Sequence, residues 1–137
     1  MSTPINDPEK AAKVFADDRA NVFHSWSAQA QISPMAIAGG AGSYFWDFTG
    51  KKYLDFSSQL VFTNIGHQHP KVVKAIQEQA AVLTTIAPQH ASEVRNQAAR
   101  SIVELAGDNF SKVFFTAAGA DAVENAIRMA RLHTRKH

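Results

Sequence analysis

The amino-acid sequence predicts an α/β protein. Two aromatic-rich strand patterns joined by a short turn lie in the first half, and several amphipathic helix patterns surround them. Near the end, a continuous apolar run leads through small residues into a last helix pattern. Strands and helices differ in the spacing of their apolar residues, so these patterns identify both kinds of element. With 137 residues, the chain is long enough for one modest domain with a core.

The first half contains signals for one helix and one hairpin. Asp7-Pro8-Glu9 indicates a helix start, because aspartate caps a helix and proline suits its first position. We expect this helix over residues 8–23. Residues 32–41 are small and contain proline and glycines, so we expect irregular structure there. Residues 43–48 and 51–56, separated by a Thr-Gly turn, predict a β-hairpin.

The second half predicts helix, helix, strand and helix. One helix begins at Pro70 and a second runs from about Ala91 to Gly107, a typical helix-ending glycine. The apolar run Lys112–Thr116 is typical of a strand buried in a parallel sheet, and the last helix follows it. A single strand cannot form a sheet. We therefore expect the chain to be a fragment of a longer protein.

Composition excludes several classes of protein. Hydrophobic residues make up 45% of the sequence and charged residues 19%, which argues against disorder. The net charge of +2 is too small to indicate nucleic acid as a partner. No apolar run is long enough to cross a membrane, and the first ten residues form no apolar signal segment. Cysteine is absent, which excludes disulfides and is compatible with the cytoplasm, where we expect the protein.

The turn from the apolar run into the last helix predicts an anion site. The first N–H groups of a helix lack intrahelical acceptors, and the helix dipole adds positive potential there. Small side chains at Gly119 and Ala120 would let a phosphate approach the backbone. The alternative is a plain strand-to-helix turn, in which small residues serve only close packing.

Histidines form a second cluster, at His67 and His69, with His90 further on. Two histidines two positions apart, without nearby acids or cysteines, make a poor zinc pattern. We therefore expect no metal site. The simpler interpretation is a turn held by side-chain hydrogen bonds.

Three segments resemble the class III aminotransferases, enzymes of fold type I that depend on pyridoxal phosphate (PLP). Residues 46–56 resemble the early hairpin of that family, and residues 64–70 resemble its glycine–histidine–proline turn. Residues 114–126 resemble its strand-to-helix turn at the cofactor phosphate. The segments occur in the family's order and spacing. The resemblance covers the chain from about Ser25 and only the N-terminal part of the family's length.

The resemblance implies a domain organisation and a cofactor. Residues 1–57 would form an N-terminal helix and hairpin segment. Residues 58–137 would begin the PLP-binding large domain with its first strand and helix. In the family, backbone amides at the positions of Gly119 and Ala120 hold the phosphate of PLP.

The resemblance also implies an activity: PLP-dependent transamination of an amine or ω-amino acid with a keto acid such as pyruvate, by a homodimer. Val61 and Ala87 would border the substrate pocket. No lysine in this chain matches the family's catalytic lysine, so we expect no catalytic residue here and an inactive isolated chain. Two alternatives stay open. One is a PLP-dependent aminomutase or racemase of the same fold, and the other is a non-catalytic fragment that acts as an interaction protein.

Overall fold

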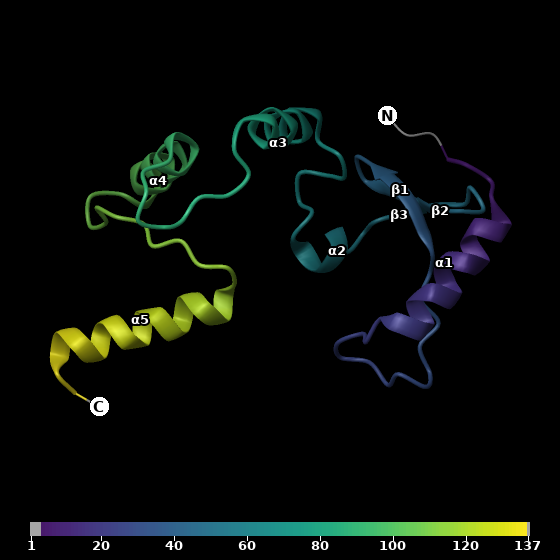
Figure 1. The fold of residues 1–137 in the computed structure, drawn as a ribbon, viewed down its shortest axis with the longest axis horizontal. Coiled ribbons are helices and arrows are strands. Elements are labelled where there is room, and N and C mark those ends of the chain that lie inside the picture. Colours follow the sequence, from purple (N-terminus) through teal and green to yellow (C-terminus); the bar gives the residue numbers. More distant parts are fainter. Residues whose placement is uncertain (1–3, 137) are drawn as a thin grey trace. The chain divides into compact units, whose positions relative to one another are not determined.

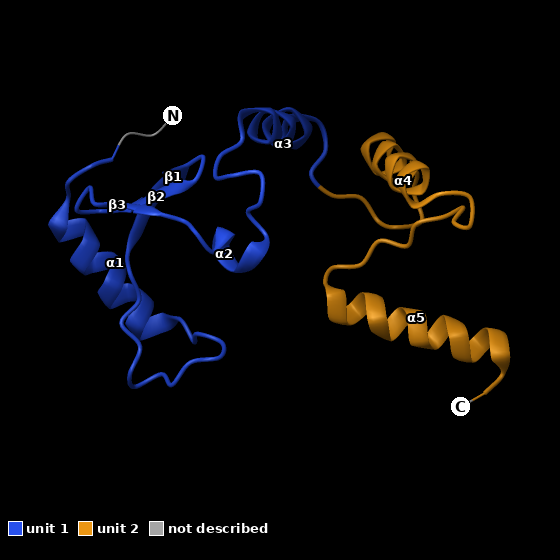
Figure 2. Ribbon diagram, turned by 180° about the vertical axis from the view of Figure 1, so that it is seen from behind, with its two compact units in different colours: residues 1–84 blue, residues 85–137 orange. Residues whose placement is uncertain are grey.

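The computed structural model describes residues 4–136, and the chain divides into two compact units, Met1–Thr84 and Thr85–His137 (Figures 1 and 2). The mixture of helices and a sheet confirms the α/β class. The expected division between residues 57 and 58 concerns the complete protein and stays a prediction. The first unit contains α1 (Pro8–Asn21), β1 (Ile37–Ala41), β2 (Tyr44–Asp47), β3 (Lys52–Leu54), α2 (Ser58–Val61) and α3 (Pro70–Val82), and the second contains α4 (Glu93–Ala106) and α5 (Gly119–Thr134).

The start of α1 follows the predicted capping pattern. The Asp7 side chain accepts a hydrogen bond of 2.9 Å from the backbone N–H of Lys10, and Pro8 occupies the first helical position. This cap satisfies one of the N–H groups that a helix start leaves without an acceptor. The helix ends at Asn21, two residues before the expected end at residue 23.

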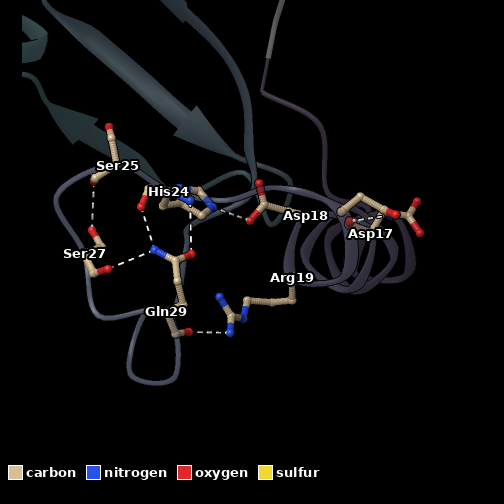
Figure 3. Close-up of polar contacts among 8 residues, drawn as sticks. Asp17, Asp18, Arg19, His24, Ser25, Ser27 and Gln29 are labelled. Carbon is tan, nitrogen blue, oxygen red and sulfur yellow. Dashed lines mark hydrogen bonds and ion pairs between the residues drawn. The ribbon is translucent and has the colours of Figure 1, made fainter.

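Polar contacts hold the loop that follows α1 (Figure 3). Gln29 is their centre: its side-chain amide donates to the backbone oxygen of His24 at 2.6 Å, and its own backbone oxygen accepts from the Arg19 guanidinium at 2.6 Å. The His24 ring Nε2 lies 2.7 Å from Oδ1 of Asp18. The loop is therefore tied to the last turns of α1, while the Trp26 side chain is fully exposed.

The sheet has three antiparallel strands in the order β1-β2-β3. The hairpin of β2 and β3 is confirmed, with Tyr44 opposite Leu54. Strand β1 differs from the predicted irregular structure of residues 32–41, because its glycines do not prevent strand pairing. It pairs with β2, with a bulge between Ile37 and Gly39. A Cβ at Gly39 would lie 3.0 Å from the indole Nε1 of Trp46, so this glycine allows close packing within the sheet.

The buried residues of the first unit lie in and beside this hairpin. Trp46, with 3% of its surface exposed, and Phe48 form the apolar core, and Asp55 is buried close by in sequence. At the hairpin turn, the Asp47 carboxylate accepts hydrogen bonds from the hydroxyl groups of Thr49 and Tyr53, at 2.7 and 2.9 Å. The Thr49 bond is the main cause that lowers the pKa of Asp47, and the bond to Asp47 raises the pKa of Tyr53.

The predicted helices of the second unit are present, but the predicted strand is not. Gly107 ends α4 with φ +85°, a left-handed conformation that glycine adopts readily. The run Lys112–Thr116 belongs to no strand, and Phe114 is 65% exposed. Within residues 4–136 no neighbouring strand pairs with this run, so its apolar residues have no sheet in which to be buried. The expectation of a first parallel strand is therefore wrong for the chain as described.

Unit two lacks a buried core among the residues described, since none between 85 and 136 is buried. In the described part of the chain, no helix combines the length and the apolar character that crossing a membrane requires.

Candidate cofactor and substrate site

The start of α5 has the geometry of an anion site. Ala118 is extended (φ −153°, ψ 165°), and the helix begins at Gly119. The first backbone bond runs from Ala122 N to Ala118 O at 3.0 Å. Within the described residues, the amides of Gly119, Ala120 and Asp121 have no acceptor, and no side chain caps the helix. Three N–H groups therefore remain available at the positive end of a 16-residue helix.

The space that a side chain at Gly119 would enter is open. A Cβ built on this residue would meet no atom within 4 Å, and its φ is outside the left-handed region. Neither packing nor backbone conformation within residues 4–136 requires glycine here. The geometry fits a phosphate group, whose oxygens need both free amides and room beside the backbone.

The two residues expected to border the substrate pocket lie in different units. Val61 is the last residue of α2 in the first unit, and its side chain is 80% exposed. Ala87 is exposed in the coil between α3 and α4, in the second unit together with Gly119 and Ala120. Each of the four is therefore accessible within its own unit, as a ligand-contacting residue must be.

Helix α2 is a left-handed turn. Its φ angles are +49° at Ser58, +49° at Gln59, +59° at Leu60 and +65° at Val61. Left-handed helical backbone costs roughly 1–2 kcal/mol per residue for L-amino acids, and a β-branched residue such as valine rarely adopts it. Sequence analysis missed this turn. The only local signal for it would be glycine or asparagine, and the segment contains neither.

A buried carboxylate joins this turn to the rest of the first unit. Asp55 Oδ1 accepts from the backbone N–H of Gln59 at 3.2 Å, and Oδ2 lies 2.7 Å from the ring Nε2 of His67. Burial alone would raise the pKa of Asp55. The hydrogen bonds from His67 and Gln59 and the charge of His67 outweigh burial, so the pKa lies below its ordinary value.

One of the two histidines makes the hydrogen bonds that the simpler interpretation predicts. His67 is held by Asp55 and also exchanges two backbone hydrogen bonds with Gly42, at 2.7 and 3.0 Å. It therefore stabilises a turn through hydrogen bonds. His69, directly before α3, has a buried ring Nδ1 without a partner among the described residues. Within residues 4–136 no three His, Asp or Glu side chains gather in a way that could hold a metal ion.

Beside the turn lies a cavity of about 380 Å³ within the first unit. Part of its wall comes from the sheet and part from the segment that follows α2. The residues that line it are Met35, Ile37, Gly39, Gly40, Phe45, Gln59, Phe62, Thr63 and His67. The Asp55–His67 contact therefore lies at the edge of a concave surface.

Comparison with known proteins identifies the family. The family model "Aminotransferase class-III" matches residues 26–137. The chain therefore belongs to the class III aminotransferase family. This agrees with the resemblance of the hairpin, the histidine turn and the start of α5.

Individual relatives agree with this assignment. The acetylornithine aminotransferase of Bifidobacterium longum is 40% identical over 97 residues, which are 70% of this chain and 22% of that protein. The crystal structure of taurine:2-oxoglutarate aminotransferase from Bifidobacterium kashiwanohense, in complex with PLP and glutamate, has a TM-score of 0.84 at 40% identity. The match covers 96% of this chain and 28% of that one. An S-selective transaminase from Arthrobacter sp. with alanine bound has a TM-score of 0.83 at 32% identity, over 90% of this chain and 28% of that one. The chain thus spans between a fifth and a third of the length of these relatives.

Proposed function

We propose that the complete enzyme containing this chain is a PLP-dependent aminotransferase that moves an amino group from an amine or ω-amino acid to a keto acid such as pyruvate. The observation that carries the proposal is the start of α5: in a chain of this family, the amides of Gly119, Ala120 and Asp121 have no acceptor among residues 4–136, and a Cβ at Gly119 would meet no atom within 4 Å. We further propose a cytoplasmic homodimer, as the family resemblance implies.

The role of this chain in cofactor binding follows from that geometry. The amides of Gly119 and Ala120 would donate to the phosphate oxygens, and the helix dipole would favour the negative charge. Ala118 offers no hydroxyl group, so at this position only the backbone could contact the phosphate. PLP, when bound, supplies the electron sink for chemistry at the amine carbon. The catalytic lysine would come from a part of the enzyme outside these 137 residues.

The role of this chain in substrate binding rests on exposed residues of each unit. Val61 would border the pocket with an apolar side chain, and Ala87 would contribute a small one. Pockets for small molecules are mostly apolar, with a few polar groups that fix orientation. An apolar border at Val61 suits the carbon chain of an amine donor.

Which keto acid accepts the amino group is best decided by experiment. One similar structure is named for 2-oxoglutarate, and another holds alanine, the amino acid that pyruvate becomes when it accepts an amino group. The test is to supply the complete enzyme with PLP, a panel of amines and ω-amino acids, and either pyruvate or 2-oxoglutarate. We expect an amino-acid product, alanine or glutamate, in equal amount to the donor consumed.

The same assay separates the alternatives. An aminomutase or racemase would convert the donor into an isomer without consuming keto acid. A non-catalytic interaction protein would bind no PLP and convert no donor. Either result would contradict the proposed transamination.

A further inference from the structure

The left-handed turn at α2 combines strain with exposure. All four of its residues have positive φ, and none is glycine. The side chains of Leu60, Val61 and Phe62 are 84%, 80% and 76% exposed. A chain segment rarely keeps such a conformation unless its surroundings impose it, and such segments are concentrated at functional sites.

Asp55 is the group in the surroundings that can impose this conformation. Within residues 4–136 it is the one side chain that accepts a hydrogen bond from the backbone of the turn, at Gln59 N. The second carboxylate oxygen is held by His67, which is itself paired with Gly42 at the edge of the sheet. The carboxylate therefore joins the turn, at Gln59, to His67 and through His67 to Gly42 at the edge of the sheet.

The direction of the turn decides which side chains it presents. In the left-handed form, Gln59 lies against the cavity beside the sheet, whereas Leu60 and Val61 are largely exposed. A change of these residues to the usual right-handed region would rotate their side chains to different directions. The identity of the exposed apolar pair therefore depends on the backbone conformation.

We propose that Asp55 is a positioning residue: its carboxylate holds residues 58–61 in the left-handed turn and thereby fixes the apolar surface that Leu60 and Val61 offer to the amine donor. The inference rests on the proposed function, because it assigns the turn to the donor side of the pocket. Asp55 itself touches neither donor nor cofactor in this account. Its effect is on which donors the enzyme prefers.

The experiment compares variants of the complete, PLP-loaded enzyme. Asp55→Ala removes the anchor, and Asp47→Ala is the matched control, because Asp47 is a hydrogen-bonded carboxylate of the same hairpin that does not touch the turn. We expect Asp55→Ala to change the ratio of kcat/KM between a long and a short amine donor about tenfold or more, mainly through KM. Asp47→Ala should lower the Tm without changing that ratio. Asp55→Asn, whose amide oxygen can still accept from Gln59, should keep most of the wild-type ratio.

A second pair of variants changes the turn itself, at Gln59. Gln59→Gly keeps the backbone N–H and removes the penalty of positive φ at one of the four residues, so Asp55→Ala combined with Gln59→Gly should regain part of the wild-type donor ratio. Gln59→Val raises the penalty while Asp55 stays in place, and it should change the ratio as Asp55→Ala does. Gln59→Val tests whether the left-handed turn sets the donor preference even where Asp55→Ala fails to fold. A wild-type ratio in Gln59→Val, or no recovery in the double variant, would overturn the proposal.

Hydrogen exchange separates this inference from the proposed function. The amides of Val61 and Thr63 donate to backbone oxygens of Ser57 and Ser58, both at 3.0 Å, so their protection reports on the turn itself. We expect both amides to exchange faster in Asp55→Ala than in Asp47→Ala. Equal exchange would contradict the anchoring role. An enzyme that shows this difference but converts no amine would refute the proposed function and leave the anchor in place.

Discussion

Replacing Gly119 by valine should weaken PLP binding by a predictable amount. The amides of Gly119 and Ala120 would each give the phosphate a hydrogen bond to a charged group, which contributes about 1.5–3 kcal/mol. A branched side chain at Gly119 would occupy the open space beside these amides and keep the phosphate from at least one of them. Since about 1.4 kcal/mol is a tenfold change, the dissociation constant of PLP should rise about 10- to 150-fold.

The fold should tolerate this change, which makes the measurement interpretable. A Cβ at Gly119 meets nothing within 4 Å, its φ is outside the left-handed region, and valine has no lower helix propensity than glycine. The assay is a titration of the complete apoenzyme with PLP, followed by absorbance and by retention on dialysis. Gly119→Ala should show a smaller rise, and Ala118→Ser should bind PLP at least as well as the wild type. Full cofactor occupancy in Gly119→Val, at an unchanged Tm, would refute the phosphate assignment.

Three further results are expected. Val61→Trp in the complete enzyme should change the order of preferred amine donors more than the Tm, because a residue at a pocket acts through shape; an equal loss with every donor and a lower Tm would place Val61 in the core. The pKa of Asp47 lies below its ordinary value of 3.8, so its ionised form stabilises the fold above that pH and the stabilisation disappears as the pH falls through the lowered pKa. The difference in Tm between the wild type and Asp47→Asn should therefore shrink as the pH falls below about 5. A difference that stays constant would contradict the hydrogen-bonding account. The isolated 137-residue chain should aggregate or bind hydrophobic dyes and convert no amine, because its second unit has no buried residue among those described; a monomer with cooperative unfolding would contradict this expectation.

Local signals in the sequence were sufficient for most of the elements. The Asp7-Pro8 pair marks the start of α1, and Gly107 marks the end of α4, because caps depend on one or two residues. The hairpin of β2 and β3 follows from alternation around a short turn. These features are decided within a few residues, so the printed sequence contains the information for them.

The features that sequence analysis missed depend on distant residues. In strand β1, Gly39 lies against Trp46, a close approach that no local pattern reveals. The run Lys112–Thr116 has a strand's composition but, among the residues described, no partner strand, and composition alone cannot supply one. The left-handed turn at α2 is anchored by Asp55, and its own residues contain no signal for it.

The candidate site was predictable in part. The pattern of small residues at the start of a helix located Gly119 and Ala120, because the anion-binding tendency of a helix start is a local property. The structure adds that their amides have no acceptor in residues 4–136. The roles of these two residues, and of Val61 and Ala87, stay predictions, since each role rests on the family resemblance and not on a local property of the residue.

The central claim is that the start of α5 holds the phosphate of PLP. A crystal structure of the complete enzyme with PLP tests it most directly. We expect phosphate oxygens within about 3.2 Å of the backbone nitrogens of Gly119 and Ala120, the usual limit for such hydrogen bonds. A phosphate bound elsewhere, with these amides facing solvent or other protein groups, would contradict the account.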